Sequence, residues 1–529
     1  MILVILHCHY ERGGVTQVVE NQVRALRETG QFERILLASG VRHSGLSSET
    51  LKAVECINVD GFDYDSDEMT VGDLASRQQR MLHHMKSQFT DYGLSIDNTL
   101  LHWHNHSLGK NTAAPGVIRS LAHEGWRILL QVHDFAEDNR PENYGRLISA
   151  MQAARKQQVD EYLYPVHDRI HYATLTTTDS LVLERLGIDR GSLHCLPNGV
   201  AVPQGIAISK EEARAKVLRT LKLPGDARWV LYPVRGIRRK NIGELLLLAR
   251  WGGENRYMGL TLKPASRMEA RSYERWKCVA AEVSNRTVFD AGESSELNLL
   301  QNVLGADYVV STSVAEGFGM AFLEPWLLGR GVIARRLNTV TDDFEKCGVD
   351  LRSFYDSIPI PGNQSWIDKC RREILDAQTK AWNHLPEAFQ PSVRESIDQE
   401  AEAIDFAKLT PQRQTETLQR MVTDRGFENA AKELSESLIK RLNQEFAGSV
   451  LVSNEDAVRE NYDAARIGES LVRVYHQMSG CRFVSEIAAT RSTDDGAPEV
   501  SVNPNVGQQR GMDLISTFRP YFPCRTELL

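Results

Sequence analysis

The sequence predicts an α/β protein with two units, each built on a doubly wound parallel sheet. A chain of 529 residues is too long for one hydrophobic core, so two or more domains are expected. The first half alternates short apolar runs with amphipathic helical segments, the pattern of a parallel sheet covered by helices. A second series of the same kind begins near Trp229.

The first unit opens with a strand, a glycine turn and a helix. Residues 2–6 form a continuous apolar run of strand length, as a strand buried on both faces requires. Gly13 and Gly14 precede a helix that ends at Gly30. This order is typical of nucleotide folds but lacks a G-x-G-x-x-G fingerprint, and a tight turn without a ligand is the alternative. Further strands are predicted at 34–38, 56–59, 100–103, 128–132 and 172–176, with helices at 76–89 and 113–123.

The second unit repeats the alternation and then changes character. Strands are predicted at 229–234, 258–262, 287–289 and 308–311, with helices from about Asn241 and across 266–283. From about Asp350 to Phe446 the chain is polar and helical, which indicates an added helical elaboration. Pro203 and Gly205 suggest a linker. The predicted domains are therefore 1–203, 204–349, 350–454 (the elaboration) and 455–529 (a last helix and tail).

Composition excludes several classes of protein. A net charge of -8 and a pI near 6.1 leave no basic footprint for nucleic acid. The eight cysteines are scattered without a C-x-x-C pair, which indicates reduced thiols rather than a disulfide frame or a zinc site. No apolar run approaches the roughly 18 residues of a spanning helix, and the first run is shorter than a signal-peptide core. We expect a soluble, cytoplasmic protein; peripheral membrane contact and the oligomeric state stay open.

Two glutamates flank the glycines after the strand at 308–311. Gly317 and Gly319 oppose helix directly after Glu316, and Pro325 is tolerated only in a first helical turn, so a helix should start near Leu323. Glu316 then lies on a loop and Glu324 at a helix N-terminus, both at the carboxyl edge of a parallel strand. Such an arrangement receives an anionic ligand carrying hydroxyls. Two surface glutamates beside a turn are the alternative.

Glu316-Gly-Phe-Gly followed by Leu323-Glu324 resembles the E-x7-E signature of retaining glycosyltransferases of family 4, which have two Rossmann-like domains facing a cleft, the GT-B fold. The resemblance implies that Glu316 lies at the donor sugar and Glu324 at the ribose. It also implies donor contacts from Gly14 and from the loop of Gly317, Phe318 and Gly319. The Pro-Asn-Gly-Val hinge at 197–200 and a terminal helix at 461–475 that crosses back to the first domain fit the same family. Pro325, where the family usually has Ala, the helical elaboration and the tail depart from it.

Four cations lie in six residues from Arg235 to Lys240, after the strand that opens the second unit. Because these cations would repel one another unless an anion lies among them, the run predicts an anion-binding site. A basic surface patch is the alternative interpretation. The family resemblance implies that Arg235 and Lys240 bind the donor diphosphate, whereas Arg238 and Arg239 could be solvated. A charge-assisted contact contributes on the order of 1.5 to 3 kcal/mol, which would help the diphosphate leave without a metal.

Histidines mark the ends of two predicted strands in the first unit. His133 ends one of them, and the resemblance to the family's His-Asp places it near the reacting sugar. His102, His104 and His106 alternate, so on a strand all three would share one side. A zinc site is conceivable, but no carboxylate or thiol lies at ligand spacing. The resemblance favours acceptor contact by His104 or Asn105 and implies no metal.

Arg140 lies on a loop after His133 and could pair with a carboxylate or phosphate of the acceptor, although a solvated side chain is the alternative.

The predicted function is a retaining glycosyltransferase that moves a sugar from a UDP-, GDP- or ADP-sugar to a small hydroxyl-bearing or sugar acceptor, with an α-linkage and no cofactor. A sugar phosphorylase or nucleotide-sugar epimerase on the same fold is the second hypothesis. A non-catalytic nucleotide-sugar-binding protein is the third.

Overall fold

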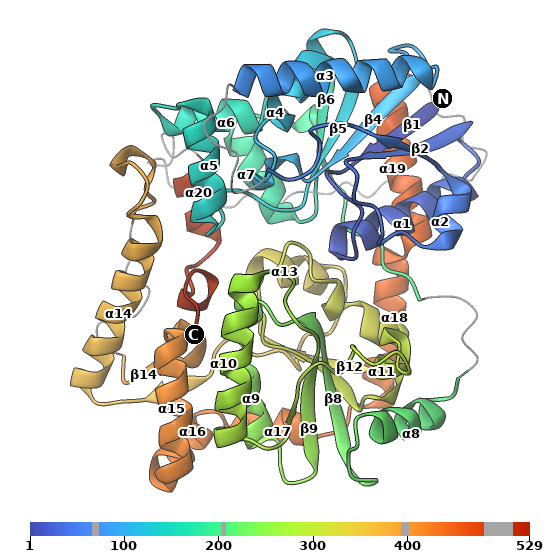
Figure 1. The fold of residues 1–529 in the computed structure, drawn as a ribbon. Helices are drawn as coiled ribbons and strands as arrows, with labels where there is room; N and C mark the ends of the chain where they lie inside the picture. Colours follow the sequence, from blue (N-terminus) through green and yellow to red (C-terminus); the bar gives the residue numbers. More distant parts are fainter. Residues whose placement is uncertain (66–73, 203–207, 393–400, 481–510) are drawn as a thin grey trace. The chain divides into compact units, whose positions relative to one another are not determined.

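The computed structural model describes residues 1–65, 74–202, 208–392, 401–480 and 511–529. The chain forms two compact units (Figure 1). Unit 1 comprises Met1–Gly199 and Ala464–Phe518, and unit 2 comprises Val200–Asp463 and Arg519–Leu529. The sequence placed its boundaries at 203/204 and 454/455, and the predicted linker residues Pro203 and Gly205 lie outside the described residues.

Unit 1 is built on a seven-stranded parallel sheet in the order β3-β2-β1-β4-β5-β6-β7. The predicted strands are confirmed to within two residues at most ends. The last strand was not predicted, because only three residues pair there and one of them is apolar in an otherwise polar stretch. The bounds are β1 (Ile2–Leu6), β2 (Arg34–Ser39), β3 (Glu55–Asn58), β4 (Thr99–His104), β5 (Arg127–Val132), β6 (Ile170–Thr174) and β7 (Leu193–Cys195).

The strand order of this sheet reverses between β1 and β4, so the loops after these two strands flank its topological switch point, where open α/β sheets bind ligands. The helices of unit 1 are α1 (Gly14–Glu28), α2 (Ser48–Ala53), α3 (Leu74–Asp91), α4 (Ala114–His123), α5 (Pro141–Met151), α6 (Lys156–Leu163), α7 (Thr177–Arg185), α19 (Ala464–Ser479) and α20 (Met512–Phe518), with short 3-10 turns η1 (His106–Leu108) and η2 (Arg190–Ser192).

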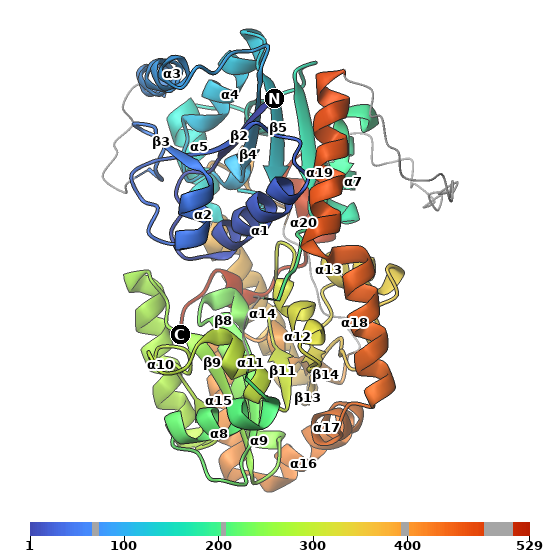
Figure 2. The same cartoon turned by 90° about the vertical axis from the view of Figure 1, so that its right-hand side faces the viewer.

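Helix α19 lies beside α1 within unit 1 (Figure 2). Leu471 and Tyr475 of α19 share one buried cluster with Val19, Val23 and Leu26 of α1. The terminal helix predicted at 461–475 therefore packs on the first sheet unit, but it begins later than expected. The preceding helix ends at Tyr462, and the extended backbone of Asp463 separates the two.

The chain passes between the units three times, at 199/200, 463/464 and 518/519, and the first two crossings are neighbours. Val200 pairs with Asp463 as an isolated bridge, and its N–H donates to the carbonyl of Tyr462 at 2.8 Å. A Cβ atom on Gly199 would lie 2.7 Å from the Cα atom of Ala464, so only glycine fits there without a backbone shift. The Asn21 side chain donates to the Gly199 carbonyl at 3.0 Å. The Pro-Asn-Gly-Val motif thus holds this crossing in place.

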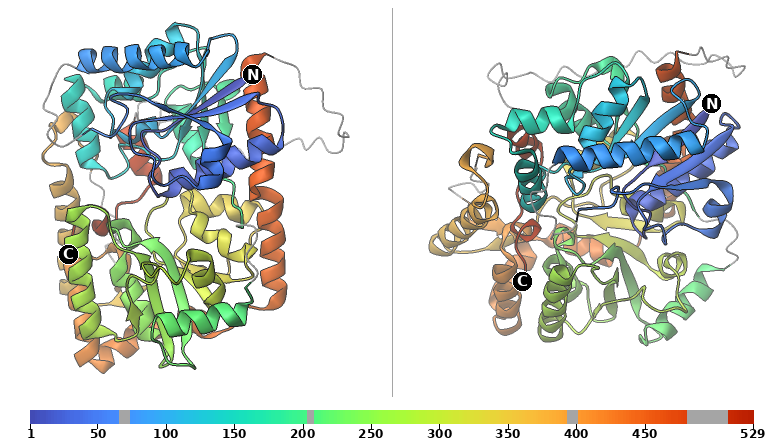
Figure 3. Two further views of the ribbon diagram at one scale, coloured as in Figure 1. Left: turned by 45° about the vertical axis from the view of Figure 1, so that its right-hand side comes forward. Right: turned by 45° about the horizontal axis from the view of Figure 1, so that its top comes forward.

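Unit 2 contains a five-stranded parallel sheet in the order β10-β9-β8-β11-β12, seen from two directions in Figure 3. Its order reverses between β8 and β11. The strands are β8 (Arg228–Arg235), β9 (Arg256–Leu262), β10 (Thr287–Val288), β11 (Tyr308–Ser311) and β12 (Gly331–Ala334). The helices up to residue 346 are α8 (Lys210–Thr220), η3 (Arg238–Lys240), α9 (Ile242–Trp251), α10 (Arg267–Val283), α11 (Leu299–Gly305), η4 (Met320–Phe322), α12 (Glu324–Leu327) and α13 (Asn338–Lys346).

The elaboration after Asp350 is helical, as predicted, but it also contains an antiparallel strand pair that the polar sequence did not reveal. The strands are β13 (Pro359–Pro361) and β14 (Ala403–Asp405). The helices are α14 (Gln364–Trp382), α15 (Pro411–Thr423), α16 (Arg425–Leu434), α17 (Glu436–Asn443) and α18 (Gly448–Tyr462), with η5 (Glu387–Phe389), η6 (Phe406–Lys408) and, near the C-terminus, η8 (Pro523–Arg525). Leu418 and Met421 of α15 lie in the same buried cluster as Trp276 and Ile333, so the elaboration shares one core with the second sheet.

Two further findings concern the described part of the chain. None of its helices is long and apolar enough to cross a membrane. Seven cysteines lie in that part, and all seven are free thiols: Cys8, Cys56, Cys195, Cys278, Cys347, Cys370 and Cys524.

Candidate active site

The loops after β8 and β11 meet at the switch point of the second sheet. Backbone contacts join them: Val314 N–H donates to the Arg239 carbonyl at 3.0 Å, and the Thr312 hydroxyl donates to the Lys240 carbonyl at 2.9 Å. Asn241 adopts a left-handed conformation with φ of 50° and leads directly into α9. The fold thereby brings Lys240 beside Glu316, 76 residues further along the chain.

Glu316 is the centre of a network of charged and hydroxyl groups. Its Oε1 atom is ion-paired with Lys240 and accepts a hydrogen bond from Ser313 Oγ at 2.6 Å, while its Oε2 atom lies 3.1 Å from Arg239 Nη1. Tyr232 Oη lies 2.6 Å from Ser313 Oγ and extends the network into the core. Burial alone would raise the pKa of Glu316, but the charges of Lys240 and Arg239 outweigh it and hold this pKa below its ordinary value.

The four cations of the β8 loop have different partners. The sequence left open that Arg238 and Arg239 are solvated, but both have carboxylate partners in the structure. Arg238 pairs with Glu269 at 2.7 Å, and Arg239 pairs with Glu316. Arg235 donates to the Lys263 carbonyl at 2.8 Å, and within the described residues no carboxylate lies at ion-pair distance from it. The acidic partners are distant in sequence, so the local run of charges could not reveal them.

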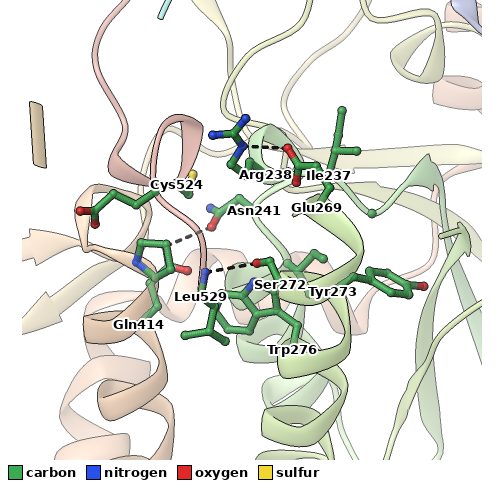
Figure 4. Close-up of a pocket in the computed structure, with 14 residues that line it drawn as sticks. Ile237, Arg238, Asn241, Glu269, Ser272, Tyr273, Trp276, Gln414, Cys524 and Leu529 are labelled. Carbon is green, nitrogen blue, oxygen red and sulfur yellow. Dashed lines mark hydrogen bonds and ion pairs between the residues drawn. The ribbon is translucent and has the colours of Figure 1, made fainter. Parts of the chain in front are cut away.

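The C-terminal segment buttresses this loop from within unit 2. A narrow crevice beside Arg238 and Asn241 is closed by the last residues of the chain, where the Leu529 N–H donates to Ser272 Oγ at 3.2 Å (Figure 4). Arg238 also donates to the Thr526 carbonyl at 3.2 Å, and Gln414 donates to Asn241 Oδ1 at 3.0 Å. The end of the tail, to which the sequence assigned no role, therefore supports the candidate diphosphate loop.

The glycine loop after Glu316 has the shape that its sequence indicates. Gly319 has a φ of +83°, and a Cβ atom there would lie 2.5 Å from the Phe322 ring, so glycine is required. Phe318 is buried, with its ring centroid 5.4 Å from that of Phe344, which leaves only its backbone for a ligand. Gly317 is partly exposed.

Glu324 is the first residue of α12, a helix of a single turn with Pro325 in its first turn, so the predicted helix start near Leu323 is confirmed. In the described parts of the chain, no group donates a hydrogen bond to the Glu324 carboxylate. Burial raises the pKa of this carboxyl to about 7. The carboxylate can therefore accept hydrogen bonds from a ligand, and it titrates near neutral pH.

His133 follows β5 at the carboxyl edge of the first sheet, as predicted, and is 5% exposed. Its Nε2 atom lies 2.9 Å from the Nδ1 atom of His104, which is fully buried. Burial lowers the pKa of His133 to about 4. His104 is too deeply buried to contact an acceptor directly, and its ring instead lies against that of His133. Asn105, 5% exposed, holds the same strand end by accepting a hydrogen bond from the Asp134 N–H at 3.0 Å.

The three alternating histidines do not share one side. Strand β4 ends at His104, and Asn105 turns the chain with a φ of 58°, so His106 leaves the row and its Nε2 atom lies 2.9 Å from the Leu163 carbonyl. His102 Nδ1 instead lies 2.7 Å from Tyr475 Oη of α19. Within the described ranges, no three His, Cys, Asp or Glu side chains are grouped as a metal site would require.

Two further predicted residues lie at the same edge of unit 1. Arg140 donates to Asp134 Oδ1 at 2.5 Å and to the Phe135 carbonyl at 3.0 Å, and Asp138 Oδ2 lies 4.0 Å from its Nη1 atom, so it has partners within the protein rather than only solvent. Gly14 is exposed at the start of α1, whose first turn carries no acidic residue and no side-chain cap. Its position leaves the helix N-terminus open to an anion.

Comparison with known proteins identifies the architecture. No protein-family model matches the chain. Sucrose-phosphate synthase from Thermosynechococcus elongatus superimposes with a TM-score of 0.51 and 14% identity, over 91% of this chain and 99% of that chain. HepE of Anabaena, solved with UDP and glucose, gives a TM-score of 0.51 and 11% identity, over 90% and 99%. The chain has the GT-B fold. Among curated proteins, mannosylglucosyl-3-phosphoglycerate synthase of Petrotoga mobilis is 27% identical over 424 residues, which cover 77% of this chain and 78% of that protein.

In the GT-B fold, each candidate site lies at the switch point of one sheet. The sequence did not reveal that Ser313 and Arg239 are partners of Glu316. It also did not reveal that Asp134 pairs with Arg140. Ser313 precedes Glu316 by three residues without any motif that marks it. His133 directly precedes Asp134, which is the one sequence signal that could have drawn attention to that carboxylate.

Proposed function

We propose that this protein is a retaining glycosyltransferase that uses a nucleotide-diphosphate sugar. The observation that carries the proposal is the network of Glu316 with Lys240 and Arg239 at the switch point of unit 2. Lys240 and Arg239 both pair with the carboxylate of Glu316, and Arg235 at the end of β8 has no carboxylate partner among the described residues. Phosphate oxygens of a ligand at this position would pair with Arg235 and Lys240.

In the proposed reaction, Arg235 and Lys240 bind the donor diphosphate. Their charges stabilise the negative charge that develops as the diphosphate leaves, which is the largest contribution expected from the protein in such a transfer. Glu316 orients the Lys240 ammonium and faces the donor sugar, while Glu324 accepts hydrogen bonds from the ribose hydroxyls. His133, neutral at pH 7, is proposed as a hydrogen-bonding group for the reacting sugar, as the family resemblance implies.

The acceptor is proposed to be an anionic glycoside. The Petrotoga relative is named as the synthase of a glycosylated 3-phosphoglycerate. Arg140, which pairs with Asp134 and more distantly with Asp138, lies at the edge of unit 1 where we place the anion of the acceptor. We therefore propose a glucosyl-3-phosphoglycerate-like compound as the acceptor class.

Incubation of the full chain with UDP-, GDP- and ADP-sugars tests the proposal. A transferase should release free nucleotide slowly from one donor without acceptor, and faster when the anionic glycoside is added. Conversion of the donor to an epimer, or release of a sugar phosphate with inorganic phosphate, would favour the epimerase or phosphorylase hypothesis. Saturable binding without any turnover would favour a nucleotide-sugar-binding protein.

A further inference from the structure

Four cationic side chains gather at the carboxyl edge of the first sheet. Lys110 follows β4 and η1, Arg42 follows β2, Arg140 lies on the loop after β5, and Arg146 lies in α5. Burial, and then the positive charges of Arg140, Arg146 and Arg42, lower the pKa of Lys110, whereas Asp134 raises it. These charges therefore act on one ammonium group beside the switch point between β1 and β4, the edge at which such a sheet binds ligands.

Lys110 differs from Arg42 and Arg140 in having no acidic partner among the described residues. Arg42 pairs with Glu11 and Asp63, both at 2.9 Å, and Arg140 pairs with Asp134 and, at 4.0 Å, with Asp138. In the described part of the chain, no carboxylate lies at ion-pair distance from Lys110. Its ammonium lies instead over the Tyr64 ring, 4.9 Å from the centroid, and the Arg42 guanidinium lies 5.8 Å from the same centroid.

The backbone holds Lys110 in this position. Gly109 has a φ of +75°, and a Cβ atom there would lie 2.9 Å from Leu147 Cδ1 and 3.1 Å from the Ala136 Cβ atom. The Lys110 carbonyl accepts a hydrogen bond from the Asp65 N–H at 2.7 Å. The side chain is thus directed by a glycine that no other residue could replace without a shift of its neighbours.

A partly buried ammonium among other cations is unfavourable unless an anion compensates it. The Tyr64 ring offers only a weak cation–π contact that it also shares with Arg42. We infer that Lys110, with Arg140 and Arg42 beside it, binds the phosphate monoester of the acceptor, an inference that rests on the function proposed above. A dianionic phosphate has enough oxygens to accept hydrogen bonds from several cations at once. A carboxylate of the protein in the same place would occupy the position of the ligand.

Calorimetric titration of the full chain with 3-phosphoglycerate tests this inference, with glycerate as the matched probe without phosphate. Wild-type protein should bind 3-phosphoglycerate at least tenfold more tightly than glycerate. Lys110→Gln should weaken 3-phosphoglycerate binding roughly 10- to 100-fold, the range of a charge-assisted contact. Lys110→Arg should stay within a few fold of wild type. Lys52→Gln, which removes an exposed lysine of α2, is the control and should leave the affinity unchanged.

Thermal unfolding separates ligand binding from a structural role. Because Lys110→Gln removes an unbalanced positive charge, its Tm should equal or exceed that of wild type. Equal 3-phosphoglycerate affinity in wild type and Lys110→Gln, no saturable binding to wild type with or without a nucleoside diphosphate, or equal affinity for glycerate would each overturn the inference. Nucleoside diphosphate binding and donor turnover, measured on the same samples, report on the proposed function separately, since failure of the Lys110 site leaves both intact.

Discussion

The Nε2 atom of His133 lies 2.9 Å from the Nδ1 atom of His104, and the two rings are 5% and 0% exposed. Burial lowers the pKa of His133 to about 4 and that of His104 well below its ordinary value. Both rings are therefore neutral at pH 7, and one of them must donate while the other accepts. The tautomers of the two rings are thus coupled, and His133 contributes an oriented hydrogen bond rather than a positive charge.

Unit 1 should lose stability as the pH falls from about 6.5 to about 4. The folded-state pKa is about 3 for His7 and His102 and about 4 for His106 and His133, so below pH 6.5 the unfolded chain binds protons that the folded chain excludes. Each such histidine changes the free energy of unfolding by up to about 1.4 kcal/mol per pH unit.

Denaturant unfolding at several pH values measures this slope. His106→Gln should lower the slope by about one proton, whereas His83→Gln, at an exposed position of α3, should leave it unchanged. A stability that does not vary with pH between 6.5 and 4.5 would contradict the assignment of neutral, buried rings.

Most strands of the two parallel sheets could be predicted, because parallel strands buried on both faces are continuous apolar runs, whereas the short strands β7, β12, β13 and β14 were not predicted. The pairing of Glu316 with Arg239 could not be predicted, since it depends on how two loops 77 residues apart in the sequence meet. The same limit applies to His106: alternation predicts a common side only while the strand continues, and Asn105 ends it. The positions of Glu316 and Glu324 were predictable because Gly319 and Pro325 restrict the backbone locally.

Arg235→Ala and Lys240→Ala should each weaken nucleoside diphosphate binding by roughly 10- to 100-fold, because each removes a charge-assisted contact to phosphate. The loss should be larger at low ionic strength, where screening is weak. Arg275→Ala is the matched control, since this arginine is exposed on α10. Fluorescence or calorimetric titration measures the affinities, and unchanged affinity in both loop variants would remove the phosphate role.

The donor KM should fall as the pH rises from 6 to 8, by roughly five- to tenfold, because the ionised form of Glu324 accepts ribose hydrogen bonds and its pKa is about 7. Glu324→Gln should raise the donor KM, abolish this pH dependence and change kcat little. Glu296→Gln, at an exposed position, is the control. Steady-state kinetics across the pH range provide the test; a pH-independent wild-type KM would speak against the ribose role.

Glu316→Gln should lower kcat by a factor on the order of 10² to 10³, the equivalent of one oriented interaction of about 3 to 4 kcal/mol in the transition state. The amide cannot neutralise Lys240 and Arg239 together, so their positions relative to the leaving diphosphate should change. Ser313→Ala removes one hydrogen bond from the same carboxylate and should have a smaller effect. Pre-steady-state turnover measures both variants, with Tm as the check on folding. An unaffected kcat in Glu316→Gln would make this stretch a structural turn.

The product should keep the α configuration of the donor. Both oxygens of Glu316 already have partners, Lys240 and Ser313 on one and Arg239 on the other, so this carboxylate is not free to attack the anomeric carbon. Retention then requires displacement from the front face, in which the leaving phosphate takes the acceptor's proton and the fixed cations stabilise the oxocarbenium-like transition state. The one-bond C–H coupling at the anomeric carbon, read by NMR, assigns the linkage. A Glu316→Ala variant supplied with azide should form no β-glycosyl azide, whereas a covalent route would produce one, and a β-linked natural product would overturn the retaining mechanism.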